Sequence, residues 1–331
     1  MKKYIALTLV LVLALFAFAG CGAKSAKTGL GVVSSISSSK EPTDKDGTAQ
    51  VDSIVAAVLV GEDGKILSCR IDTAQTKIGF TATGAISTPL DSEVKSKQEK
   101  GPEYGMKGVS GIGKEWNEQA DALAAYVVGK TVDEIKAIPL NEEGAPTGAD
   151  LVSSVTVHIN GYIEAIAKAV ANAKDLGAKA GDTLGLGVTT SIAKSKDATA
   201  EAEGLAQAYS HYAATTFGKD GKITSCYMDA SQTNVGISVE GKITTDLAST
   251  FKTKLELGPE YGMKGASGIG KEWNEQADAF AKYVTGKTAD EVKGMALNEE
   301  GAPTGADIVS SVTIHVTDMI SVVTKAAANA K

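Results

Sequence analysis

The residues best suited to chemistry form a hydroxyl-rich segment that occurs twice in this 331-residue chain. Residues 147–156 read Thr-Gly-Ala-Asp-Leu-Val-Ser-Ser-Val-Thr, and residues 304–313 repeat them with one change. Asp150 and Asp307 are favourable N-cap residues, so each segment is predicted to open the last helix of its repeat. The free N–H groups and dipole of a helix start can bind an anion such as phosphate. A well-capped helix that binds no ligand is the alternative.

Other side chains near these segments are weaker candidates for binding. His158 and His315 follow the two segments and could contact a ligand or simply be half-exposed, and a lone His is a poor metal site. Four aromatic residues could stack on a flat ring or belong to the core: Trp116, Trp273, Tyr104 and Tyr261. The two repeats share no Ser-His-Asp or Cys-His set, so hydrolase chemistry is not indicated.

The chain contains two copies of one unit. Residues 101–121 return as residues 258–278 with a single change, and residues 140–150 return unchanged as residues 297–307. We expect a leader at 1–20, a tether at 21–28, a first domain at 29–176, a linker at 177–184 and a second domain at 185–331. Cys69 and Cys226 hold equivalent positions, and we expect both to be buried as small hydrophobic residues rather than paired.

Within each copy the predicted order is strands first and helices afterwards. The runs 54–60 and 66–71 flank an Asp-Gly turn, and 77–83 looks like a third strand. Helical spacing marks 114–128, and a capping box at 131–134 opens a short helix. The predicted fold is therefore α+β, with two tandem copies of a small domain in which helices pack on an antiparallel sheet.

The hydroxyl-rich segments carry a resemblance to a known family. The pattern Asp-x-x-Ser-Ser-Val-Thr at 150–156 and 307–313 resembles the Asp-x-x-Ser-Gly-Ala-Thr signature of FMN-binding domains. The Asp-Gly-Lys-Ile turns at 63–66 and 220–223 are also similar to that family. The resemblance implies that a flavin transferase joins FMN covalently to Thr156 and Thr313 through a phosphoester.

The resemblance also implies roles for the residues that precede each threonine. Ser154 and Ser311 stand where the family has Gly, and Val155 and Val312 stand where it has Ala, so bulkier side chains lie beside the phosphate site. The residues that match the pattern are expected to cap the helix and bond the phosphate. They are Asp150, Ser153, Asp307 and Ser310.

The N-terminal residues and the net charge indicate where the protein works. Lys2 and Lys3 precede an apolar stretch at 4–19, as in a secretory signal, and Cys21 follows as the lipidated residue of a pattern that resembles the bacterial lipobox. An uncleaved anchor or an ordinary secretory signal is the alternative, and in every case the protein lies outside the cytoplasmic membrane. A net charge of -7 argues against binding nucleic acid.

The whole chain resembles the two-domain extracellular flavoprotein lipoproteins of Gram-positive electron-export systems. This implies a lipid-anchored electron carrier on the extracytoplasmic face of the cell membrane, rather than an enzyme with its own substrate. A quinol-linked membrane donor would supply the electrons, and an extracellular acceptor would receive them. A binding or adhesive surface lipoprotein that keeps the fold without flavin is the alternative.

Overall fold

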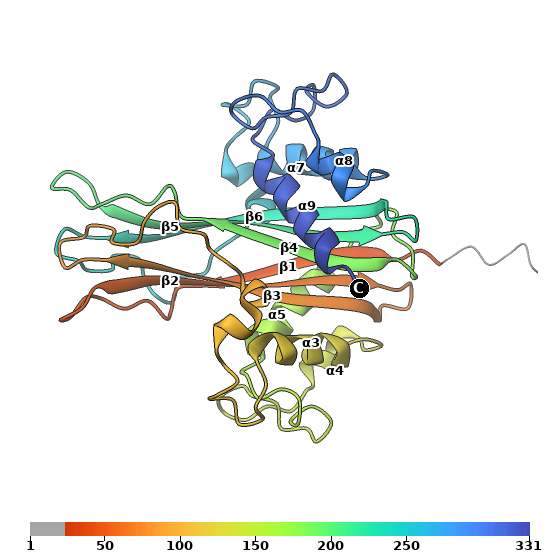
Figure 1. Cartoon of the computed structure of the whole chain (residues 1–331), viewed down its shortest axis with the longest axis horizontal. Helices are drawn as coiled ribbons and strands as arrows, with labels where there is room; N and C mark the ends of the chain where they lie inside the picture. The colour runs from red at the N-terminus through yellow and green to blue at the C-terminus, as the bar shows by residue number, and fades with distance from the viewer. Residues whose placement is uncertain (1–23) are drawn as a thin grey trace, which may run out of the picture.

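The computed structural model describes residues 24–331, and the predicted leader and Cys21 lie outside this range. The described residues form two similar α+β units, as predicted, each with a three-stranded antiparallel sheet followed by helices (Figure 1). The first unit contains β1 (Lys27–Ser35), β2 (Gly47–Val60), β3 (Ile66–Phe80), α2 (Lys97–Lys100), the 3₁₀ helix η1 (Gly101–Tyr104), α3 (Trp116–Tyr126), α4 (Val132–Lys136) and α5 (Asn160–Ala171). The second contains β4 (Thr183–Ser191), β5 (Gly204–Phe217), β6 (Ile223–Ile237), α6 (Lys254–Leu257), η2 (Gly258–Tyr261), α7 (Trp273–Val284), α8 (Ala289–Lys293) and α9 (Thr317–Asn329).

The three strands of the sheet in the first unit are not the three that were predicted. β3 runs unbroken from Ile66 to Phe80, so the separate strand expected at 77–83 is wrong. Its middle was not recognised because Asp72, Thr73 and Thr76 are polar yet buried. The remaining strand is β1, which was not predicted from the sequence. The sheet order is β1-β2-β3, with β2 in the centre.

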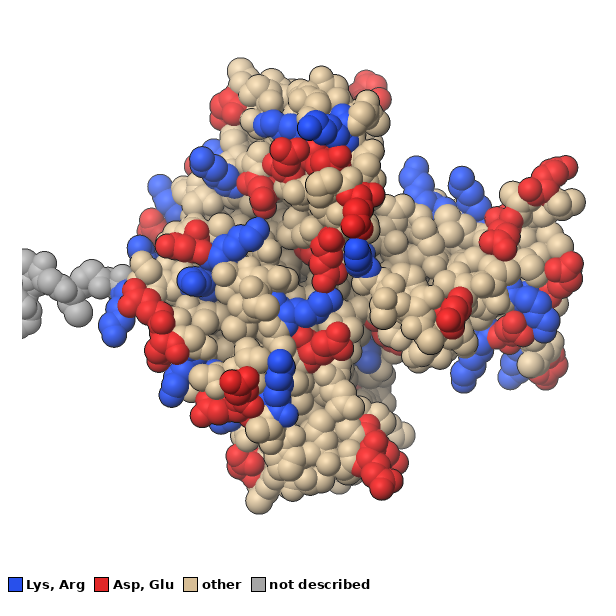
Figure 2. Space-filling model, turned by 180° about the vertical axis from the view of Figure 1, so that it is seen from behind, with Lys and Arg blue, Asp and Glu red and all other residues tan. Residues whose placement is uncertain are grey.

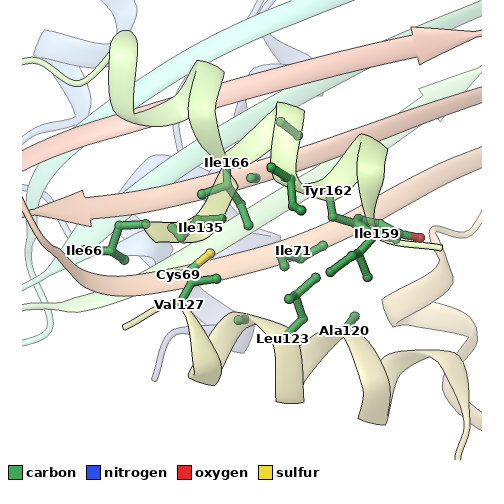
Figure 3. Packing of buried hydrophobic residues seen from close by; sticks show 14 of the residues in the cluster. Ile66, Cys69, Ile71, Ala120, Leu123, Val127, Ile135, Ile159, Tyr162 and Ile166 are labelled. Carbon is green, nitrogen blue, oxygen red and sulfur yellow. The ribbon is translucent and has the colours of Figure 1, made fainter. Parts of the chain in front are cut away.

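One face of each sheet packs against the helices of its own unit. In the first unit, Ile66 and Cys69 of β3 meet Leu123 of α3 and Ile166 of α5 in one buried cluster (Figure 3). The second unit has an equivalent cluster that includes Cys226. Both cysteines are free and buried, which confirms the prediction from sequence.

The glycines of β1 and β4 bring the last helix of each unit close to the sheet. A Cβ atom at Gly31 would collide with the carbonyl oxygen of Ala165 in α5. In the second unit a Cβ atom at Gly187 would collide with the carbonyl oxygen of Val322 in α9. Glycine is needed here because the strand and the helix backbone are in direct contact.

The other faces of the two sheets pack against each other. Leu30 and Leu59 of the first unit share a buried cluster with Leu186 and Tyr212 of the second. Another shared cluster contains Phe80 and residues of β5 and β6. The molecule is thus a stack of helices, sheet, sheet and helices, with the helices on the outside (Figure 1). Each unit therefore has a core of its own on the helix side and shares buried clusters with the other unit, because each sheet is apolar on both faces.

Polar contacts between the units come in reciprocal pairs. Lys168 of α5 pairs with Glu256 at 2.7 Å, and the equivalent Lys325 of α9 pairs with Glu99 at 2.5 Å. At the other end of the sheets, the Asp197 carboxylate accepts a hydrogen bond from the Ile86 N–H at 2.7 Å. The Glu41 carboxylate accepts the corresponding bond from the Ile243 N–H at 3.2 Å. Such reciprocity is typical of a two-fold interface, here formed within one chain.

The tether and linker expected from composition are partly structured. β1 begins at Lys27, inside the predicted tether, and β4 begins at Thr183, inside the predicted linker. The buried Thr28 hydroxyl lies 2.6 Å from the Ser225 hydroxyl of the other unit. Apart from these ends, the predicted domain boundaries stay a prediction.

The described surface has mixed charge and no membrane-spanning segment. Lys and Arg side chains are interspersed with Asp and Glu over the face drawn in Figure 2. None of the helices within residues 24–331 is long and apolar enough to cross a membrane.

The close contact between Gly187 and α9 predicts that one added methyl group lowers the stability of the protein. Gly187→Ala should lower the free energy of unfolding by about 1–3 kcal/mol or more, because the Cβ atom would force α9 away from the sheet. Gly108→Ala is the matched control, since a Cβ atom there has no neighbour within 4 Å. Urea denaturation of both variants checks this, and equal stabilities would contradict the close packing.

The shared cores predict that one unit alone is not a stable monomer. A fragment of residues 183–331 would expose Leu186 and Tyr212, which are 4% and 0% exposed in the full chain. We expect it to self-associate through this sheet face or to precipitate. Light scattering coupled to gel filtration measures the outcome, and a folded, cooperatively melting monomer would show that the second unit does not need its partner.

Candidate functional site

The hydroxyl-rich segments precede the last helices and do not start them. α5 begins at Asn160 and α9 at Thr317, and neither helix start has a side-chain cap. The prediction that Asp150 and Asp307 cap these helices is therefore wrong. The chain instead forms turns, with hydrogen bonds from Leu151 N to Gly148 O and from Val155 N to Leu151 O. Burial of these two apolar side chains holds the turns against the core.

The aspartates and serines of the hydroxyl-rich segments do not share the environment of the threonines. Asp150 and Asp307 are exposed, and burial together with these carboxylates raises the pKa values of Tyr126 and Tyr283. In the second copy, Thr313 lines a cleft whose walls do not include Asp307, Ser310 or Ser311. In the first copy, Ser153 is exposed and Ser154 is half-buried. Thr313 is thus the residue of its hydroxyl-rich segment that lines a cleft.

A buried glutamine holds each threonine. The Oε1 atom of Gln276 in α7 accepts hydrogen bonds from Thr313 N at 2.8 Å and from Thr313 Oγ1 at 3.3 Å. Gln119 in α3 does the same for Thr156, at 2.8 and 3.2 Å. Both glutamines are 0% exposed. Because the threonine O–H points at the amide, its oxygen lone pairs are directed away from it.

The same glutamines connect the threonines to the Gly-rich loops. Gln276 Nε2 donates to Ser267 Oγ at 3.0 Å, and Gln119 Nε2 donates to Ser110 Oγ at 3.1 Å. The buried Glu272 carboxylate, at the start of α7, accepts a hydrogen bond from Met263 N at 2.8 Å. These loops, the Gly-rich segments 105–113 and 262–270, are therefore anchored on α3 and α7.

The second unit contains a cleft of about 620 Å³ at this position. Thr313 lies at its wall together with Tyr261, Trp273 and His315, three residues that the sequence had marked as weaker candidates. Four further polar residues were not recognised from sequence: Tyr209, His211, Lys254 and Asp318. The available signal was the Tyr-Ser-His-Tyr run in an otherwise apolar strand, where polar side chains interrupt the core pattern of the repeat.

Lys254 is the buried cation of this cleft. It is 3% exposed, and its Nζ atom donates to Tyr209 OH at 2.6 Å. The ammonium also lies 4.4 Å from the ring centre of Tyr261 and 5.1 Å from that of Trp273, which allows cation–π attraction. Burial lowers the pKa of Lys254 to about 8, against the opposing attraction of Asp229. The first unit has the same arrangement, with Lys97 between Tyr104 and Trp116.

His211 is a buried imidazole beside this lysine. Its ring centre lies 4.5 Å from that of Tyr209, and its Nδ1 atom lies 3.5 Å from Asp318 Oδ2. That distance is too long for a good hydrogen bond, and Nδ1 has no other partner among the described residues. Burial, and then the charge of Lys254, lower the pKa of His211 to about 3. The imidazole is therefore neutral at pH 7.

Trp116 and Trp273 belong to the core as well as to the sites. Both are nearly fully buried and pack in the helix-side clusters. Trp116 Nε1 donates to Tyr162 OH at 3.0 Å, whereas Met319 holds the equivalent position in the second unit. The interpretation of both tryptophans as core residues is correct, and Trp273 additionally lines the cleft.

Asp229 positions the segment that carries Lys254. Its Oδ1 atom accepts hydrogen bonds from Ala230 N at 2.7 Å and from Leu255 N at 3.1 Å, which fixes the start of α6 against β6. Burial raises the pKa of Asp229 to about 7, although these hydrogen bonds act in the opposite direction. Ionised Asp229 therefore costs stability in the folded state.

The raised pKa predicts how an Asp229→Asn variant behaves with pH. The folded wild type keeps the Asp229 proton up to about pH 7, whereas the unfolded chain releases it near pH 4. The wild type thus loses stability from this group as the pH rises from 4 to 8, and the neutral Asn does not. The variant should become more stable relative to the wild type over this range, measured by urea denaturation.

Asp220→Asn, in the exposed turn between β5 and β6, is the control for loss of a carboxylate outside the core. Its difference from the wild type should stay constant over the same pH range. A difference for Asp229→Asn that is also constant would show that the buried carboxyl is not protonated in the folded protein.

The comparisons with known proteins identify no relative. No protein-family model matches the chain, and neither the curated proteins nor the solved structures contain a match. The resemblance to FMN-binding domains consequently depends on the short threonine motifs and the turns before them. The function is inferred from the chemistry of the cleft.

Proposed function

We propose that the protein is an exported flavoprotein that holds FMN at Thr313 and Thr156 and carries electrons at the cell surface. The observation that supports this best is the place of Thr313. Its hydroxyl, fixed by the buried Gln276, lies at the wall of a cleft that also presents a buried ammonium and aromatic rings. No other predicted residue of the motif has such surroundings.

The size and lining of the cleft suit a flat, anionic cofactor. Clefts of about 300–1,000 Å³ hold small molecules and cofactors, and this one is about 620 Å³. Tyr261 and Trp273 offer aromatic surface to a planar ring, and Lys254 and Lys194 offer positive charge to a phosphate or a ring oxygen. A cofactor would also be sheltered by the anchored Gly-rich loop, whose Ser267 and Gly268 form part of the wall.

The departures from the family motif do not obstruct this cleft. Val312 and Val155, which stand in place of Ala, are both 0% exposed and pack into the helix-side cores. Their extra methyl groups therefore face the protein interior. Ser311, which stands in place of Gly, is half-buried and does not line the cleft.

The residues of the chain would orient the attachment reaction. Gln276 accepts a hydrogen bond from the Thr313 hydroxyl. The lone pairs of the hydroxyl oxygen therefore remain free to form the bond to phosphorus when a flavin transferase delivers FMN. The bond between the flavin phosphate and its leaving group on the transferase-bound donor breaks, and the Thr313 oxygen forms the O–P bond in its place. The hydroxyl proton departs with the leaving group, so the chain gains the mass of FMN less water. FMN, once bound, supplies reversible redox chemistry that the side chains of this fold lack.

The proposed setting is the outer face of the cell membrane, with Cys21 as the lipid anchor. A cofactor that is covalently bound cannot diffuse away from an exported protein. Two sites in one rigid stack would keep two redox centres at a high effective concentration. A quinol-linked membrane donor and an extracellular acceptor are the partners that this proposal requires.

Mass spectrometry tests the attachment directly. Protein made together with a flavin transferase should carry two increments of FMN less water and absorb visible light. Thr313→Ala and Thr156→Ala should each remove one increment, and the double variant should remove both, because no other hydroxyl of the motif is held by a buried glutamine.

Ser310→Ala and Ser153→Ala are the matched controls, since both serines are exposed on the same turns. They should retain both increments. A colourless wild-type protein with the mass of the bare polypeptide would contradict flavinylation and favour the alternative, a binding or adhesive surface lipoprotein.

A further inference from the structure

The two units differ at three positions that meet in space. Tyr209, His211 and Asp318 of the second unit correspond to Asp52, Ile54 and Gly161 of the first, each 157 residues earlier in the chain. Lys254, Tyr261, Trp273, Gln276 and Thr313 have identical counterparts at this spacing. The cleft lining differs further at Lys194, Ala266 and Ile314, where the first unit has Ser38, Val109 and Val157.

In the first unit these positions form a closed apolar contact. A Cβ atom on Gly161 would lie 2.6 Å from Ile54 Cδ1, so the isoleucine fills the space above the glycine. The Asp52 side chain turns to its neighbour on β2, where Gln50 Nε2 donates to its Oδ2 atom at 2.6 Å. The other oxygen, Asp52 Oδ1, is buried without a hydrogen-bond partner, but a carboxylate oxygen only accepts hydrogen bonds and cannot donate one to a ligand oxygen beside Lys97.

In the second unit the same positions carry hydrogen-bonding groups with unused capacity. Lys254 donates to Tyr209 OH, so the hydroxyl hydrogen of Tyr209 remains available for another acceptor. His211, only 5% exposed, has an Nδ1 atom without a hydrogen-bond partner and lines the cleft together with Tyr209 and Asp318. A buried polar atom without a partner is costly, and a ligand that supplied the partner would remove that cost.

We propose that the second unit alone is a reversible binding site for a planar conjugated molecule that carries a carbonyl or ionised oxygen. Tyr209 and Lys254 hold that oxygen, the neutral His211 imidazole bonds an adjacent polar atom of the ring, and Tyr261 and Trp273 contact its faces. Asp318 lines the cleft beside them, with Oδ2 3.5 Å from His211 Nδ1. The inference rests on the cleft used in the proposed function, but it does not require covalent attachment at Thr313.

Riboflavin is the probe that separates the two proposals. It has the conjugated ring and its carbonyl oxygens but no phosphate, so it cannot be esterified to a threonine. We expect wild-type protein, made without a flavin transferase, to bind one riboflavin per chain, measured by quenching of riboflavin fluorescence and by calorimetry. Asp220→Asn, in the exposed turn between β5 and β6 and outside the cleft lining, should bind it as well as the wild type does.

Exchange of the three residues between the units tests the assignment. The triple variant Tyr209→Asp, His211→Ile, Asp318→Gly should bind riboflavin at least about tenfold more weakly, since it loses the hydrogen bonds. The reciprocal variant Asp52→Tyr, Ile54→His, Gly161→Asp should bind two molecules per chain. The milder Tyr209→Phe keeps the ring and should weaken binding by about five- to tenfold.

Each outcome decides one proposal. Riboflavin binding by the wild type but not by the triple variant, in protein whose circular dichroism and melting are unchanged, supports the inference even if mass spectrometry finds no covalent FMN. Absence of binding by the wild type, or equal binding by Tyr209→Phe and the wild type, would overturn the inference. Covalent FMN on both threonines would leave the proposed function intact in that case.

Discussion

Burial of both faces of a small sheet is the constraint on which the whole architecture depends. Along β2, Val58 and Val60 point to the helices of their own unit, whereas Ala57 and Leu59 point to the other unit. A strand with this pattern cannot leave either face in water without exposing a row of apolar side chains. The helices of one unit cover only one face of its sheet. The sheet of the other unit covers the second face, and this produces the four-layer stack.

The reciprocal contacts between units follow from that stack. Because the two sheets are copies of one another, each contact has a counterpart on the other side of the interface, as the pairs Lys168–Glu256 and Lys325–Glu99 show. The glycines of β1 and β4 serve the outer layer, where they let α5 and α9 approach the sheet. The helices therefore lie on the outer faces of the molecule, and the cleft of the second unit lies between its helices and β5.

The two units have kept their packing and differ in their clefts. The features that maintain the fold are the same in both: the paired glycines, the capping boxes, and the buried glutamine that holds a threonine. The features that differ are side chains in the middle of β2 and β5 and at the start of the last helix. In the first unit Ile54 closes this region against Gly161. In the second unit His211 and Asp318 replace that contact with groups that can bind a ligand, within an unchanged frame.

The fold class, the repeat and the buried cysteines were predictable from sequence because they depend on local patterns: alternation, capping residues and the recurrence of long identical segments. The start of the last helix was not, because burial of Leu151 and Val155 overrides the preference of Asp150 for a helix cap. The cleft was not predictable either. Tyr209, Lys254 and Asp318 are far apart in the chain and meet only when β5, α6 and α9 pack on one another. The packing of one sheet on the other was not predictable either, because an apolar run in the sequence shows that both faces of a strand are buried but not which element covers each face.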